Sequence, residues 1–129
     1  MNIVPVNKLA DVWPEVEGWL ARAVSQNLGD ENLLDVLIAL AQGRYSLWHE
    51  PGKCALVTQI QEFPRQKIIV LIYAGAPEGS GAVERFKLLW EQERAALKAA
   101  GITRVRMYGL RDWGKVLGVE PRFVTQVDL

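Results

Sequence analysis

The sequence predicts a single α/β (α+β) domain, spanning residues 1–129, in which helices cover a mixed central sheet. Three observations support this prediction. Hydrophobic residues make up 50% of the 129 positions, which is enough to build one core. Strand-like segments follow one another directly at residues 45–48, 53–61 and 67–74. A long amphipathic helix at residues 82–100 then leads to another strand, as in a parallel crossover connection.

The N-terminal part is expected to supply one short strand and two helices. Residues 3–6 form the strand, and Pro5 indicates a sheet edge because proline has no backbone N–H. The first helix is expected to begin near Asp11, with Pro14 in its first turn, and to break at residues 27–30. Leucines at helical spacing predict a second helix over residues 31–42, which ends at Gly43.

The middle of the chain is expected to form a meander. The first two strands are joined at residues 50–53, where Pro51 and Gly52 favour a turn. Residues 67–74 are apolar on both faces, which indicates a strand in the middle of a sheet. We expect this strand to lie parallel to residues 103–109. A short helix at residues 112–117 and a strand at residues 122–127 complete the order β-α-α-β-β-β-α-β-α-β.

Charge and hydropathy argue against nucleic acid and membrane partners. The 15 basic residues equal the 15 acidic ones, so the chain lacks the excess of positive charge that is typical of proteins that bind a polyanion. No apolar run approaches the roughly 20 residues that span a bilayer. The first residues lack the charged and apolar regions of a signal peptide. These features predict a cytoplasmic protein that binds neither nucleic acid nor membrane.

The chain contains one cysteine and one histidine, which do not make a typical transition-metal site, and no internal disulfide can form. We therefore expect no metal. Cys54 lies in an apolar run and is expected to be a small buried hydrophobe rather than a nucleophile. His49 is expected on the surface at a strand end.

A glycine-rich turn, Ala-Pro-Glu-Gly-Ser-Gly at residues 76–81, joins the apolar strand to the long helix. A helix N-terminus offers unpaired N–H groups, and glycines let a phosphate approach the backbone closely. The candidate phosphate ligands are the backbone amides of Gly79, Ser80, Gly81 and Ala82. Two interpretations stay open, because Glu78 would repel a phosphate unless it points away. The turn is either a phosphate cradle or a plain strand-to-helix turn capped by Ser80.

The element order together with this turn resembles the fold of the GCN5-related N-acetyltransferases (GNAT). In that family the turn reads Arg/Gln-x-x-Gly-x-Gly/Ala, and its amides hold the pyrophosphate of acetyl-coenzyme A. Gly79 and Gly81 match the glycine spacing, whereas Ala76 stands where Arg or Gln is usual. The resemblance implies that acetyl-coenzyme A lies between residues 67–74 and 103–109. It also implies that amides near Ile72 and Tyr73 polarise the acetyl carbonyl.

The residues for proton transfer depart from the family's pattern. Residues 115–123 resemble its helix-to-strand junction, but Gly114 stands where a tyrosine often protonates the leaving thiolate. Residues 67–74 contain no carboxylate, although the family frequently places an acidic base on this strand. Tyr108 is the one catalytic candidate, as proton donor to sulfur, and its alternative interpretation is a partly buried strand tyrosine.

Residues 97–103 and 109–114, with the Leu-Trp pair at 47–48, resemble the GNAT-like proteins encoded by tailed bacteriophages. Two functions stay open. The first is an acyl-coenzyme A-dependent N-acyltransferase or a weakened relative. The second is a catalytically degenerate GNAT-fold protein that binds a host enzyme or a virion component in the host cytoplasm. Arg111 and Trp113 would form its contact patch, because tryptophan is enriched at interface hot spots.

Overall fold

The computed structural model describes residues 2–26, 30–79 and 81–107. The elements are β1 (Asn2–Ile3), the 3-10 helix η1 (Val6–Lys8), α1 (Leu9–Val24), α2 (Leu33–Ala41), β2 (Ser46–Glu50), β3 (Cys54–Phe63), β4 (Gln66–Gly75), α3 (Ala82–Ala99) and β5 (Arg104–Met107). This α+β arrangement follows the predicted order as far as β5. The helix and the strand expected at residues 112–117 and 122–127 lie outside the described residues.

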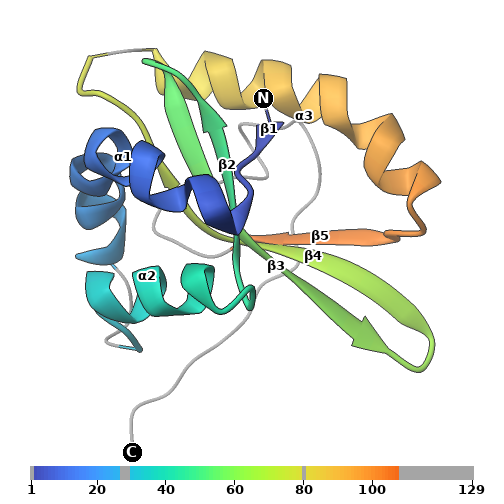
Figure 1. Ribbon diagram of the computed structural model, residues 1–129. Helices are drawn as coiled ribbons and strands as arrows, with labels where there is room; N and C mark the ends of the chain where they lie inside the picture. The colour runs from blue at the N-terminus through green and yellow to red at the C-terminus, as the bar shows by residue number, and fades with distance from the viewer. Residues whose placement is uncertain (1, 27–29, 80, 108–129) are drawn as a thin grey trace, which may run out of the picture.

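Within the described residues, five strands form one mixed sheet in the order β1-β2-β3-β4-β5. Neighbours are antiparallel from β1 to β4, whereas β4 and β5 are parallel. The helix α3 makes the crossover between the two parallel strands, as Figure 1 shows. Ile68, Ile69 and Val70 of β4 are all buried, because the strand has neighbours on both edges and side-chain packing on both faces. The prediction of a central strand parallel to the one after the long helix is therefore confirmed.

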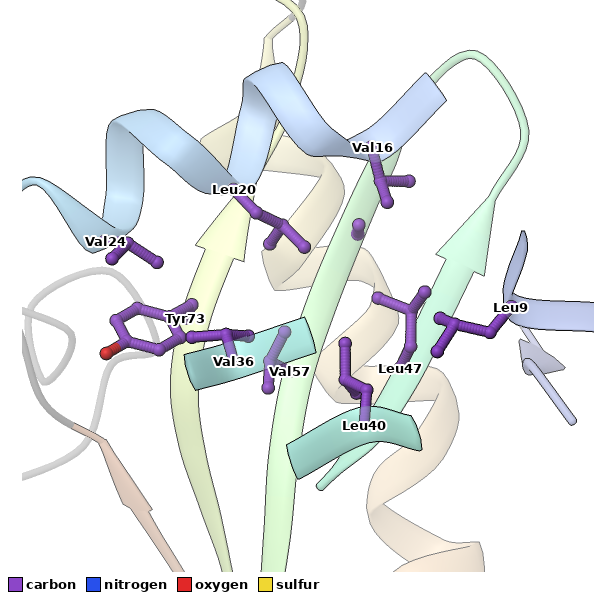
Figure 2. Packing of buried hydrophobic residues seen from close by; sticks show 10 residues of the cluster. Leu9, Val16, Leu20, Val24, Val36, Leu40, Leu47, Val57 and Tyr73 are labelled. Atoms are coloured by element: carbon purple, nitrogen blue, oxygen red, sulfur yellow. The ribbon is translucent and has the colours of Figure 1, made fainter. Parts of the chain in front are cut away.

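The two faces of the sheet are covered by different helices (Figure 1). Side chains that alternate along the strands point to opposite faces. One face packs against α1 and α2 in a buried cluster (Figure 2), whose members are Leu9, Val16, Leu20, Val24, Val36, Leu40, Leu47, Ala55, Val57 and Tyr73. The other face meets α3 around an apolar cavity of about 100 Å³, lined among others by Trp48, Leu56, Leu71, Phe86, Leu89 and Trp90.

The helix α1 lies so close to the end of β4 that only glycine fits at the contact. A Cβ atom built on Gly75 would lie 2.7 Å from the carbonyl oxygen of Trp19 and 2.8 Å from its carbonyl carbon. Both are backbone atoms of α1, which cannot swing away as the end of a side chain can. Gly75 is not among the glycines with a positive φ. The glycine is therefore required for space rather than for backbone conformation.

Several predicted boundaries near the N-terminus are wrong by a few residues. The strand β1 ends at Ile3 instead of residue 6, because Pro5 has no N–H for the ladder. The turn η1 runs directly into α1, which begins at Leu9 rather than near Asp11, so that Pro14 lies inside the helix. The helix α2 begins later than expected, at Leu33.

The start of α2 is set by a capping box that the sequence analysis did not identify. The backbone N–H of Asp35 donates to Oδ1 of Asn32, and the backbone N–H of Asn32 donates to Oδ2 of Asp35, both at 2.9 Å. Two backbone donors that a helix start would leave unpaired are thereby satisfied. These two hydrogen bonds fix the start of α2 at Asn32.

Gly75→Ala is expected to lower the free energy of unfolding by about 1–3 kcal/mol, because the added methyl group overpacks against the backbone of α1. Denaturant melts measure this change. The matched control is Gly18→Ala in α1, where a Cβ meets no atom of the described residues within 4 Å. The control should be neutral or should stabilise by up to about 1 kcal/mol, since alanine favours a helix over glycine. Equal effects of the two substitutions would contradict the close contact.

Candidate functional site

The glycine-rich turn has the backbone geometry that an anion site requires. Gly79 and Gly81 both have a φ of +70°, a conformation that glycine adopts without strain. Gly81 is the N-cap residue of α3, and within the described residues no side chain caps this helix. A Cβ built on Gly79 would meet no atom of the described residues within 4 Å. The N-cap position belongs to Gly81. Ser80, the cap in the alternative interpretation, lies outside the described residues.

Two arginine contacts hold the turn in place. At its start, Nη2 of Arg22 in α1 donates to the carbonyl oxygen of Ala76 at 3.2 Å. Just after its end, Nε of Arg85 in α3 donates to Oε2 of Glu50 in β2 at 2.7 Å, and Nη2 of Arg85 contacts Oε1 of Glu50. Paired contacts between arginine and a carboxylate fix direction as well as distance. The turn is thus fixed from α1 on one side and from β2 on the other.

Charges of both signs lie around the start of α3. Oε2 of Glu84 lies 3.7 Å from the position of a Cβ on Gly81, and a carboxylate there favours the helix dipole but disfavours a bound phosphate. Lys53 and Arg85 help to line an adjoining cavity of about 360 Å³. Because the carboxylate of Glu84 opposes a bound phosphate, a phosphate at this turn would depend on the backbone amides. The residues present fit the pyrophosphate of coenzyme A through the backbone rather than through a dedicated side chain.

A β-bulge interrupts β4 at the residues proposed to contact the acyl group. Val57 of β3 pairs with Tyr73, whereas the next residue, Thr58, pairs with Leu71, so Ile72 has no partner in β3. Consequently Ile72 and Tyr73 both pack against the cluster under α1 and α2. The described pairing of β4 with β5 extends to Leu71 and Met107. The bulge follows immediately, and bulges are frequent beside active sites.

The phenol of Tyr73 makes a contact that the sequence analysis did not predict. Its Oη donates to Oε1 of Glu31 at 2.8 Å. Tyr45 donates to the same carboxylate, at 3.1 Å to Oε1 and 3.2 Å to Oε2. Glu31 lies between α1 and α2, and it is partly buried. A carboxylate is therefore brought to β4 from another segment, although β4 has none of its own.

The environment of Tyr45 keeps its phenol protonated. Burial raises the pKa of Tyr45 above its ordinary value of 10.0, and the charge of Glu31 and the hydrogen bond to it raise this pKa further. Each cause disfavours the phenolate. Tyr45 consequently remains a hydrogen-bond donor to Glu31 across the neutral pH range.

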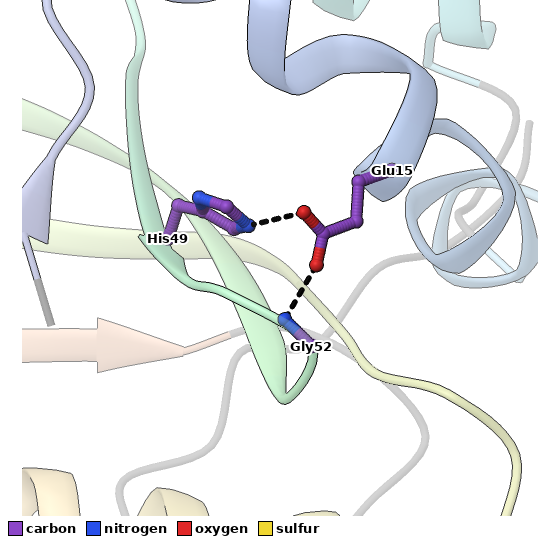
Figure 3. A network of polar contacts seen from close by, with 3 residues as sticks. All are labelled: Glu15, His49 and Gly52. Atoms are coloured by element: carbon purple, nitrogen blue, oxygen red, sulfur yellow. Dashed lines mark hydrogen bonds and ion pairs between the residues drawn. The ribbon is translucent and has the colours of Figure 1, made fainter.

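The expected surface position of His49 is wrong. Its side chain is only 9% exposed, and Nε2 lies 3.2 Å from Oε2 of Glu15, because alternation along β2 turns this residue toward α1. The other oxygen of Glu15 accepts from the backbone N–H of Gly52, so one carboxylate ties α1 to β2 and to the following turn (Figure 3). Cys54, by contrast, is buried as expected, and burial raises the pKa of its thiol.

Several predicted site residues lie outside the described residues, namely Ser80, Tyr108, Arg111 and Trp113. The proton donor to sulfur and the contact patch therefore stay predictions. Of Ala82, the structure describes the backbone, as the first residue of α3. Within the described ranges, no group of three or more His, Cys, Asp or Glu residues is arranged to hold a metal ion. None of the helices in these ranges has the length and hydropathy to cross a membrane.

Tyr45→Phe is expected to remove part of the alkaline loss of stability. Because the folded pKa exceeds 10.0, the protonated phenol stabilises the fold fully below that pH, and this contribution is lost as pH rises through the folded pKa. Denaturant melts at neutral and alkaline pH measure the difference. Glu31→Gln should shrink the alkaline loss as well, since the charge that disfavours the phenolate is gone. An unchanged alkaline profile in Tyr45→Phe would show that Tyr45 does not carry this effect.

No family model matches this sequence, and no curated protein matches it. Solved structures do match over nearly the whole chain. An aminoglycoside acetyltransferase from an uncultured soil metagenomic sample, in complex with sisomicin, has a TM-score of 0.62 at 11% identity, covering 99% of this chain and 93% of that one. A Trypanosoma brucei acetyltransferase has a TM-score of 0.59 at 12% identity, covering 99% and 97%.

A third structure, a mutant protein from Thermus thermophilus, has a TM-score of 0.53 at 16% identity, covering 100% of this chain and 97% of that one. The resemblance to phage-encoded proteins finds no support in these matches and stays a prediction. Identities this low establish the architecture alone. The chain has a GNAT-like α+β fold with a mixed sheet, similar to the fold of these acetyltransferases.

Proposed function

We propose that the protein is an N-acyltransferase that takes its acyl group from acetyl-coenzyme A. The observation that carries the proposal is the turn before α3, in which two glycines at a φ of +70° precede a helix that no described side chain caps. A bulge in β4 lies just upstream of this turn. Both features occur in a chain that shares its fold with acetyltransferases.

In this proposal the backbone does most of the binding. Acetyl-coenzyme A supplies an acyl group as a thioester. The amides of residues 79–82 hold its pyrophosphate, and the dipole of α3 favours negative charge there. Amides at Ile72 and Tyr73 bind the acyl carbonyl oxygen and favour attack on its carbon. Arg22 positions the start of the turn through the carbonyl oxygen of Ala76.

A second candidate is an interaction protein that has kept the fold without the chemistry. It is favoured by Ala76, which offers a methyl group at the position where the family has Arg or Gln, and by Gly114 in place of tyrosine. A host enzyme or a virion component as partner, contact through Arg111 and Trp113, and a cytoplasmic location remain predictions. The enzyme must bind coenzyme A and the interaction protein need not, so a measurement of coenzyme A binding distinguishes the two candidate functions.

Gly81→Asp is expected to weaken acetyl-coenzyme A binding at least about tenfold. An aspartate at this position would place a carboxylate beside the backbone amides that the phosphate needs, and the φ of +70° would strain any residue other than glycine. The negative charge of the aspartate would repel the pyrophosphate, and charge effects at helix N-termini reach about 2 kcal/mol, which exceeds the roughly 1.4 kcal/mol of a tenfold change. Titration calorimetry of the wild-type protein and the variant measures the effect.

The matched control is Gly101→Asp, at the opposite end of α3. Gly101 has a φ of +83°, and a Cβ there meets no atom within 4 Å in the part of the chain that the structure describes. This control introduces the same charge and a similar backbone strain, but it should leave acetyl-coenzyme A binding unchanged. No binding by the wild-type protein at millimolar acetyl-coenzyme A would reject the enzyme. Equal weakening in both variants would place the pyrophosphate elsewhere.

A further inference from the structure

We propose that the cavity between the sheet and α3 is a binding site for a small neutral molecule, a single apolar ring that carries one hydrogen-bond acceptor. The cavity has a volume of about 100 Å³ and lies on the face of the sheet that α3 covers. A heteroaromatic ring such as pyridine is the simplest member of this class. The inference does not rest on acyl transfer, because the described lining of the cavity contains none of the residues assigned to acetyl-coenzyme A.

The size and the lining of the cavity indicate the kind of molecule that fits. The strands β2 to β5 and the helix α3 all contribute apolar side chains, and of the described lining residues only Glu93 carries a charge. Apolar cavities of about 150 Å³ in other proteins stay dry and bind benzene. At about 100 Å³, this cavity has space for one small ring. Water suits it poorly, because a buried water typically makes about three hydrogen bonds.

The indole of Trp90 supplies a hydrogen-bond donor that has no acceptor in the described structure. Two of the described lining residues are tryptophans, and their N–H groups differ in this respect. Nε1 of Trp48 in β2 donates to Oγ1 of Thr58 in β3 at 2.8 Å. Nε1 of Trp90 in α3 is shielded from solvent, and no described residue accepts a hydrogen bond from it. A buried donor without an acceptor keeps the full cost of losing its water, and a ligand with an acceptor would remove that cost.

The indole of Trp90 is held in position from its own helix. Arg94 follows one turn later, and its guanidinium carbon Cζ lies 5.6 Å from the centroid of the Trp90 ring. A cation at this distance from an indole is attracted to the face of the ring. Leu89, the neighbour of Trp90, is buried and lines the same cavity. The donor is therefore in place before a ligand arrives, which lowers the ordering cost of binding.

Glu93 restricts the charge of the ligand. It lies one turn after Trp90 and is half-buried, but it does not accept a hydrogen bond from the Trp90 indole. Its carboxylate would repel an anion, so fatty acids and other carboxylates do not fit. A cation would lose its hydration in a lining that is otherwise uncharged, and one half-buried carboxylate does not offset that loss. A neutral ring with an acceptor meets neither obstacle.

Benzene and pyridine are matched probes of this site, because they have the same shape and only pyridine carries an acceptor. Pyridine is neutral at slightly alkaline pH. Nuclear magnetic resonance titrations of the isotope-labelled wild-type protein follow the indole N–H signals of Trp48 and Trp90. We expect both probes to bind and to shift signals of residues that line the cavity. Pyridine, unlike benzene, should move the indole proton of Trp90 to lower field, as a new hydrogen bond does, but not that of Trp48.

Trp90→Phe keeps an aromatic ring at the cavity and removes the N–H donor. The ratio of the dissociation constants of pyridine and benzene cancels the effect of the altered cavity shape. This ratio should rise about fivefold, which corresponds to the roughly 1 kcal/mol net contribution of one hydrogen bond. Trp48→Phe is the matched control, because it removes an indole from the same cavity whose N–H is already bonded to Thr58. There the ratio should not rise, and denaturant melts verify that both variants fold.

Each outcome decides the inference. If the wild-type protein binds no benzene up to the solubility limit, or if the shifts map to the cluster under α1 and α2, the cavity is not the site and the inference is overturned. An unchanged ratio in Trp90→Phe overturns it as well. Should Trp90→Phe fail to fold, the wild-type indole signals decide, because a Trp90 proton that responds equally to both probes contradicts the hydrogen bond. None of these measurements involves acetyl-coenzyme A, so the proposed function stands or fails separately.

Discussion

The position of β4 relative to α1 is set where the backbone of the helix at Trp19 meets Gly75 and leaves no space for a side chain. Two side chains of the same helix make further contacts. Glu15 joins it to His49 and to the turn at Gly52, and Arg22 joins it to Ala76. Positions 15, 19 and 22 recur at helical spacing and therefore share one face. The glycine-rich turn depends on this face, because it begins at the residue directly after the closest contact.

Much of the fold was predictable because it is recorded in local patterns. The apolar run at residues 67–74 indicated a central strand, and the long amphipathic helix after it indicated a parallel crossover; both are confirmed. The errors near the N-terminus arose where local rules conflicted. A proline tolerated in a first turn lies inside α1 instead, because η1 had already started the helical path before Leu9. The bulge at Ile72 had no signature in the sequence, since it is a property of two paired strands.

The candidate site likewise has one part that was predictable from the sequence and one part that was not. Glycine spacing marked the turn, because a phosphate site made of backbone amides requires glycine at particular positions. The arrangement of Glu31, Tyr45 and Tyr73 left no comparable mark. These residues come from three separate segments and meet only when α1 and α2 pack on the sheet. Residues 67–74 contain no carboxylate, whereas the fold brings Glu31 to Tyr73 of this strand from another segment.

Cys54 has a practical consequence for measuring any reaction that liberates coenzyme A. It is the only cysteine in the chain, it is fully buried, and burial raises the pKa of its thiol. The thiolate is the nucleophile that attacks a thiol reagent, and a reagent in solution cannot reach the fully buried side chain of Cys54 in the folded protein. The folded protein should therefore contribute almost no background to a colorimetric thiol assay. Free coenzyme A could be followed continuously in that assay without replacing a single residue of the protein.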